Sequence, residues 1–139
     1  MEQEPVLCHA IILSDTVILE AGTGKLSIIG AFSRYNFPSF PFLVPPFVVT
    51  VLITNLKGPL ERFPITIRVE NRRTGHVLAS ASGEIGASNE LTKSEIIEVP
   101  IQLPPINYPE PGVYKIIALA ENSPLAERDL TVGSLATVA

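Results

Sequence analysis

Four residues near the N-terminus carry the side chains best suited to nucleophilic chemistry. The stretch "CHAIILSD" brings together Cys8, His9, Ser14 and Asp15. A thiol or hydroxyl nucleophile, an imidazole base and a carboxylate that orients the base are the parts of a hydrolase with a covalent intermediate. Their spacing matches no known nucleophile turn, and a strand followed by a turn at Ser14 and Asp15 explains the same residues. We therefore predict no catalytic residue and no enzyme. The alternative is a small-ligand binder or hydrolytic enzyme with a site near Cys8, His9 and Asp15.

Metal ligands are sparse in this chain. It has two histidines and one cysteine, whereas zinc sites draw three or four ligands from His, Cys, Asp and Glu. Cys8 and His9 are adjacent, so in a strand their side chains face opposite sides. His76 follows a glycine and is expected at a solvated hairpin tip. The only aspartates, Asp15 and Asp129, lie near opposite ends of the chain. We predict no metal site and no cofactor.

The overall composition favours a protein partner. Ten basic residues are scattered among fourteen acidic ones, and the net charge is −4, which argues against nucleic acid because that binding depends on neutralising phosphates. The hydrophobic share is 46% and the charged share only 17%. Such a chain is not disordered, and it leaves few charges to cover a surface. We expect an apolar patch that binds a protein partner or a second copy.

Three features of the sequence bear on location. A single cysteine cannot form an internal disulfide, and the acidic start "MEQEP" is unlike a secretion signal. No run approaches the roughly 18 apolar residues that a membrane-spanning helix needs. We predict a cytoplasmic protein without a membrane span.

Strands rather than helices must position these side chains. Thirteen prolines interrupt the chain, and a proline inside a helix costs about 3 kcal/mol. Residues 64–71, "PITIRVEN", alternate with a period of two and precede a turn with Gly75, so with residues 77–85 they predict a hairpin. Residues 94–103 also alternate, and Pro100 marks an edge strand because it cannot donate to a ladder.

Other runs are apolar on both faces and are expected in the middle of a sheet. These are residues 5–13, 47–54 and 113–120. Residues 16–21 and 25–32 flank "GTG" and predict a second hairpin, whose returning strand is also expected in the interior. The predicted fold is a single all-β domain over residues 1–139, an antiparallel immunoglobulin-like β-sandwich of about eight or nine strands. Residues 126–132 form its last strand, and residues 133–139 are expected to fray.

The stretch "EPGVYKI" resembles the tyrosine corner of immunoglobulin-like sandwiches. By that resemblance Gly112 makes the turn and Tyr114 opens the penultimate strand, with its hydroxyl bonded to the backbone a few residues upstream. The whole chain also resembles a family of small bacterial proteins of unknown function, through "CHAIIL", "GKLSIIGAF", "FPSFPF" and "PGVYKI". That resemblance implies a β-sandwich and transfers no activity.

The segment "YNFPSFPFLVPPF" gathers five aromatic rings beside prolines, namely Tyr35, Phe37, Phe40, Phe42 and Phe47. One interpretation is a rigid crossover between sheets, whose rings cover the open end of the core. The other is a set of exposed rings that form an interaction site. We predict a non-catalytic protein-interaction or structural module that self-associates, with these rings as candidate interaction residues.

Overall fold

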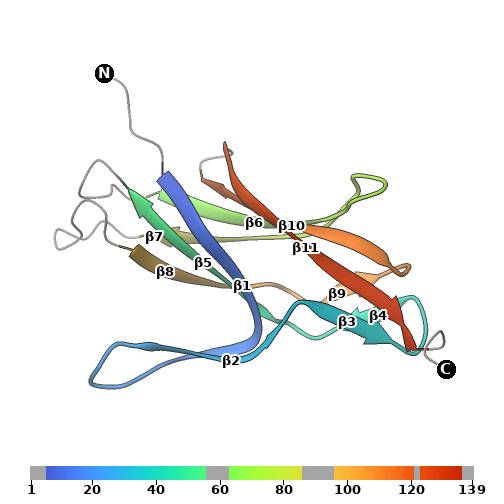
Figure 1. The fold of residues 1–139 in the computed structure, drawn as a ribbon, viewed down its shortest axis with the longest axis horizontal. Helices are drawn as coiled ribbons and strands as arrows, with labels where there is room; N and C mark the ends of the chain where they lie inside the picture. Colours follow the sequence, from blue (N-terminus) through green and yellow to red (C-terminus); the bar gives the residue numbers. More distant parts are fainter. Residues whose placement is uncertain (1–5, 56–62, 86–95, 121–122, 136–139) are drawn as a thin grey trace.

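The computed structural model describes residues 6–55, 63–85, 96–120 and 123–135. The described residues contain eleven strands and no α-helix (Figure 1). In chain order the strands are β1 (Val6–Leu19), β2 (Leu26–Phe32), β3 (Arg34–Phe37), β4 (Phe42–Val44), β5 (Val48–Asn55), β6 (Phe63–Asn71), β7 (Val77–Ile85), β8 (Ile96–Gln102), β9 (Ile106–Tyr108), β10 (Gly112–Ala120) and β11 (Ser123–Ser134). The all-β prediction is confirmed.

The strands form two large sheets and a small one. The first sheet has the order β2-β1-β5-β8, the second β3-β11-β10-β6-β7, and β4 pairs with β9 alone. Leucine, isoleucine and valine side chains from both large sheets meet in one buried cluster, with Leu13 and Val51 from the first sheet and Ile67, Ile116 and Leu130 from the second. Burial of these faces is the dominant stabilising contribution, at about 25 cal/mol per Å² of apolar surface.

Several predicted elements are present as expected. β6 and β7 form a hairpin, and Gly75 in its turn takes a φ of +76°. β1 and β2 form the second hairpin. β8, which contains Pro100, lies at the edge of its sheet. The runs that are apolar on both faces became the central strands β1, β5 and β10.

The number and direction of strands differ from the prediction. The described residues hold eleven strands rather than eight or nine, because β3, β4 and β9 are pieces of three or four residues in proline-rich segments. Strands this short carry too few residues to show a period of two. The arrangement is also not wholly antiparallel, since β3 runs parallel to β11.

Three local predictions were wrong. β2 is an edge strand rather than an interior one. It lies in the same sheet as β5, so the two strands that flank residues 35–47 belong to one sheet and not to two. Ser14 and Asp15 lie inside the continuous strand β1 instead of in a turn. Of the tail predicted to fray, Gly133 and Ser134 are paired with Asn36 and Phe37 as part of β11, and residues 136–139 lie outside the described residues. Long-range pairing holds each of these segments, and local sequence does not report it.

Candidate functional site

The rings of residues 35–47 are mostly packed inside the protein. Phe37 and Phe47 are buried, whereas Tyr35, Phe40 and Phe42 are half-buried against the core. Phe37 stacks on Phe42 with ring centroids 4.2 Å apart, and it also stacks on Tyr35 at 5.3 Å. This burial favours the interpretation in which the rings cover the core over the one in which they form an exposed interaction site. The exposed apolar side chain of this segment is Leu43, at 63%.

The tyrosines of this aromatic cluster are not poised for acid–base chemistry. Burial, reinforced by the negative charge of Asp15, raises the pKa of the Tyr35 hydroxyl far above its usual range. Burial, with smaller effects from Tyr35 and Tyr114, does the same to the pKa of Tyr108. Both hydroxyls are therefore neutral near pH 7, and neither can act as a general base there.

The tyrosine-corner geometry is present at the start of β10. Tyr114 is fully buried, and its hydroxyl donates a 2.6 Å hydrogen bond to the backbone carbonyl of Glu110. Gly112, the first residue of β10, has a φ of +155°, which L side chains rarely adopt. The hydrogen bond four residues upstream is the one that the sequence pattern predicts. It closes the loop between β9 and β10.

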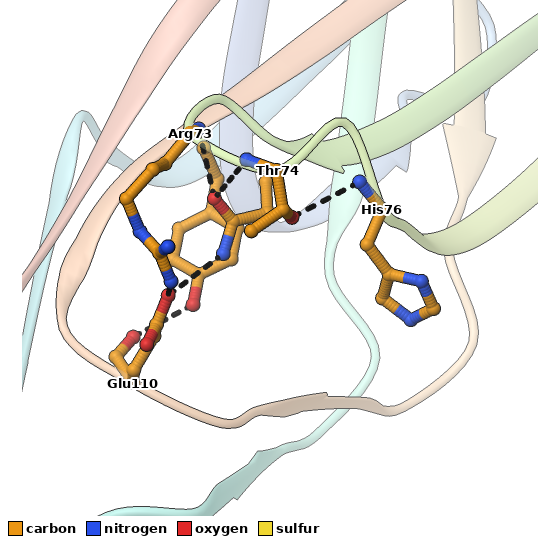
Figure 2. Close-up of polar contacts among 6 residues, drawn as sticks. Arg73, Thr74, His76 and Glu110 are labelled. Atoms are coloured by element: carbon orange, nitrogen blue, oxygen red, sulfur yellow. Dashed lines mark hydrogen bonds and ion pairs between the residues drawn. The ribbon is translucent and has the colours of Figure 1, made fainter.

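A polar network joins this corner to the β6–β7 turn (Figure 2). The side-chain oxygen of Asn71 accepts bonds from the backbone N–H groups of Arg73 and Thr74, while its amide donates to Glu110 at 3.1 Å. Arg73 pairs with the same carboxylate. The hydrogen bond from Arg73, and then that from Asn71, lowers the pKa of Glu110. His76 points away from the group in Figure 2.

A hollow of about 360 Å³ lies beside this network, lined by residues 71–73 and 110–113. Its volume is at the lower end of the range for small-molecule sites, about 300–1,000 Å³. Its charged side chains already have partners, because Arg73 pairs with Glu110 and Arg72 pairs with Asp129 at 3.0 Å. The contacts are those of a structural corner that fixes a turn against a loop.

Cys8 and Asp15, two residues of the alternative site, lie apart. Cys8 and Asp15 lie on one continuous strand, β1, and seven residues of extended chain span roughly 20 Å. The side chain of His9 lies outside the described residues. Burial raises the pKa of the Cys8 thiol, and the hollow beside it is only about 150 Å³. A nucleophile, base and orienting acid require contact distances, so these residues do not form one catalytic group.

The part of the chain that the structure describes contains no group of three or more His, Cys, Asp and Glu side chains able to hold a metal ion. In the same ranges, no helix has the length and apolar character to cross a bilayer.

Among the described residues, three of the six large hydrophobic side chains that are exposed lie on the outer half of the β1–β2 hairpin. We call residues 16–29 the β1–β2 arm; it extends away from the rest of the protein (Figure 1). Three side chains on it are largely exposed: Ile18 at 50%, Leu19 at 68% and Ile29 at 45%. Three more are partly exposed, namely Val17, Leu26 and Ile28. In the described structure, β1 is the element against which β2 packs extensively.

The arm extends the core-facing side of its sheet beyond the core. Leu13, which is fully buried, shares a face with Val17 and Leu19 because side chains of a strand alternate. Cross-strand pairing adds Ile28 opposite Val17 and Leu26 opposite Leu19 on that face. On this face of β1, Leu13 is fully buried, Asp15 is exposed, Val17 is partly exposed and Leu19 is 68% exposed. Within the described residues, the second sheet ends before the arm, and this face has no layer over it.

The four outer strands of the two large sheets differ in protection. β8 contains Pro100 and Glu98, β3 is only four residues long, and β7 has the polar sequence "VLASASGEI" and lies beside β8. Proteins guard edge strands with prolines, charges or short length, because unpaired N–H and C=O groups invite another chain. β2, "LSIIGAF", has none of these. The β1–β2 arm is therefore the candidate functional site.

Comparison with known proteins places the chain in a family. The sequence profile of a family of unknown function, DUF6941, matches residues 9–133. The chain belongs to DUF6941. The sequence resemblance to a family of unknown function is confirmed as membership of that family. Membership of DUF6941 brings no activity or ligand with it. The chain matches none of the curated proteins.

Among solved structures, the DUF6941 chain is similar to the alkylpurine DNA glycosylase AlkC of Pseudomonas fluorescens, bound to DNA containing an abasic site analogue. The identity is 10%, the TM-score is 0.47, and the match covers 92% of this chain. The chain spans 30% of the length of that protein. A likeness at this level carries no functional information.

Sequence reasoning had missed the arm. Residues 16–29 contain a signal, because apolar residues on both faces flank the short polar turn "EAGTGK". A strand that is apolar on both faces can lie in the middle of a sheet, or it can be exposed and form part of a binding surface. Periodicity is the same in both cases, so the interior interpretation was the default.

Proposed function

We propose that this DUF6941 protein is a non-catalytic protein-interaction or structural module that self-associates, and that it does so through the β1–β2 arm. The observation that supports this most directly is the core-facing side of the first sheet, which continues into the arm with no opposing layer among the residues that the structure describes. Exposed apolar surface of this kind lowers the free energy of association when a partner removes it from water.

A second copy of the chain is the partner that the proposal names. Half-covered apolar side chains that extend an existing core are typical of homodimer interfaces, which resemble a domain core divided between two chains. The exposed residues sit on a hairpin whose two strands are joined along their length, so the surface is held in place before a partner arrives. Such preorganisation lowers the entropy cost of binding.

The finer parts of the proposal concern class and setting. Within the all-β class we assign the fold to the immunoglobulin-like sandwiches, supported by two facing sheets and the Tyr114–Glu110 corner. We place its action in the bacterial cytoplasm, in line with the sequence resemblance and the single cysteine. The net charge of −4 supports a protein partner rather than nucleic acid.

The test is a pair of substitutions in the arm. In Leu19→Ser/Leu26→Ser, a cross-strand pair on the core-facing side of the arm loses its apolar surface while the buried core is untouched. Sedimentation velocity is expected to show an associated wild type and a variant whose self-affinity is at least tenfold weaker. Val77→Ser is the matched control, because Val77 is exposed at 42% on β7. A wild type that stays monomeric at all concentrations, or an arm variant that associates as tightly as wild type, would falsify the proposal.

A further inference from the structure

One side of the sandwich has two strand edges without a neighbouring strand in the described ranges. β2 pairs with residues 13–19 of β1, and β3 pairs with residues 131–134 of β11. The preceding parts of the same strands, residues 6–12 of β1 and 123–130 of β11, are paired on one side only, by β5 and β10. We call these two segments the open side. Unpaired edges of this length invite pairing with another chain.

The edge of β1 presents the carbonyl of Ile11. The N–H of Leu103 donates to the carbonyl of Phe47 at 2.9 Å, and the β5–β8 register continues from that pair. Hydrogen bonding alternates along an antiparallel ladder, so Val51 bonds toward β8 and not toward β1. Ile11 lies opposite Val51, and its backbone groups therefore point away from β5, to the open side.

The edge of β11 presents the backbone of Glu127 and Asp129. The N–H of Arg72 donates to the carbonyl of Val113 at 3.1 Å, in line with the β6–β10 register. Val113 therefore bonds toward β6, and β10 bonds to β11 at every second residue from Tyr114. This alternation leaves Glu127 and Asp129 to direct their backbone groups outward.

Arg128 lies between these two edges and is half-buried. It shares a face of β11 with Leu130 and Val132, which are buried, so its side chain starts toward the interior. Its guanidinium donates to the Ile11 carbonyl on the other sheet at 2.9 Å. An inward-pointing charge on an edge strand is one of the devices by which proteins block strand addition. The hollow of about 150 Å³ beside the arginine is lined by small side chains of both strands, among them Cys8, Ala10 and Ala126.

We propose that Arg128 is an edge guard, which keeps the open side from pairing with a strand of another copy. An added strand would cover the guanidinium, and a charge taken out of water without an ion-pair partner is strongly destabilising. If the side chain turned away instead, the Ile11 carbonyl would lose its donor. Self-association is thereby confined to the β1–β2 arm, whose β2 edge has neither a proline nor a charge. That last step rests on the proposed function, whereas the guard does not.

Removal of the charge tests the guard. Arg128→Val is compared with its parent in the Leu19→Ser/Leu26→Ser background, where the arm no longer contributes. Sedimentation velocity is expected to show self-association at least tenfold tighter than that of the parent, because a valine on an open edge favours strand pairing. Arg128→Lys keeps an inward charge and is expected to behave like the parent. Lys115→Val is the matched control, since it makes the same change of charge on β10, which has a strand on either side.

Proline substitution identifies the edge that pairs. Glu127→Pro, added to Arg128→Val, removes an outward N–H of β11 and is expected to weaken the new association at least tenfold. Far-ultraviolet circular dichroism and thermal melting check that each variant is folded. If Arg128→Val is unfolded, Arg128→Gln takes its place, because it loses the charge but can still donate to Ile11.

Three results would overturn the guard: a folded Arg128 variant that associates no more than its parent, a Lys115→Val protein that associates as strongly, or association that the proline leaves unchanged. A wild type that is monomeric at all concentrations overturns the proposed function alone. The guard is then decided by comparing Arg128→Val directly with wild type.

Discussion

Tyr108 and Tyr114 are neighbours in the aromatic cluster, with ring centroids 5.0 Å apart, yet their hydroxyls have different surroundings. The Tyr114 hydroxyl donates to the carbonyl of Glu110. The Tyr108 hydroxyl is buried without a hydrogen-bond partner among the described residues. An unsatisfied buried hydroxyl lowers stability, whereas a satisfied one contributes to it. The two tyrosine hydroxyls therefore have opposite effects on stability, because only one of them has a hydrogen-bond partner.

We expect Tyr114→Phe to lower the free energy of unfolding by about 1 kcal/mol, because it removes the hydrogen bond to Glu110. Tyr108→Phe is the matched control. It keeps the ring packing and removes only an unpaired polar atom, so it is expected to be neutral or stabilising by up to about 1 kcal/mol. Urea unfolding of the two variants measures both values. Equal losses in the two proteins would contradict the assignment of the corner.

The carboxylate of Glu110 predicts a dependence of stability on pH. Its pKa is lowered in the folded protein by the hydrogen bonds from Arg73 and Asn71, so the folded state favours the charged form. The associated stabilisation is fully present above the ordinary glutamate pKa, about 4.3, and it is lost as the pH falls through the lowered folded value. We expect wild type to exceed Glu110→Gln in stability at pH 7, and the difference to disappear at pH 2–3. Thermal melts across this range check it, and parallel profiles would argue against the network.

At the scale of elements, residues 35–47 pack their aromatic rings into or against the core. These residues contribute the short strands β3 and β4 to two different sheets. The ring of Phe37 on β3 stacks on the ring of Phe42 on β4. Phe47, directly before β5, contacts Phe32 edge to face with centroids 5.3 Å apart. Large rings beside prolines suit this place, because each ring buries much area while the rigid backbone loses little entropy on folding.

Substitutions in this segment separate a cover from an interface. Phe37→Ala is expected to cost about 3–5 kcal/mol, as for other buried phenylalanines, and Phe40→Ser less, because Phe40 is half-buried. Leu43→Ser, at an exposed position of the same segment, is expected to change stability little. Thermal melting with size-exclusion chromatography measures both properties. A Phe37→Ala protein that melts like wild type but elutes at a different size would instead indicate an interface.

At the scale of the whole molecule, the first large sheet extends beyond the second. The second sheet packs against the first in one buried cluster, and the edges of β7 and β8 lie side by side. The first sheet continues into the β1–β2 arm, where Leu19 and Ile29 are exposed. Association through the arms would cover exposed surface without disturbing either core. Association is therefore expected to leave the fold of each copy unchanged.

Much of the secondary structure could be predicted from the sequence because its causes are local. A period of two in residues 64–71, a glycine with positive φ at position 75 and a proline at position 100 each act within a few residues. The tyrosine corner is similarly compact, since Tyr114 and Glu110 are four residues apart. The short strands β3, β4 and β9 escaped prediction because they exist only through partners far along the chain.

The amino-acid sequence by itself determined that this chain forms β-strands between its prolines, turns at its glycines and closes a tyrosine corner. It also carried the composition that requires apolar surface to be covered. Only the tertiary structure decided which apolar strands are covered. Val51 on β5 and Leu19 on β1 belong to equally apolar runs, but the first is buried and the second is 68% exposed. The physical reason is that burial depends on the layer opposite a strand, and long-range topology places that layer.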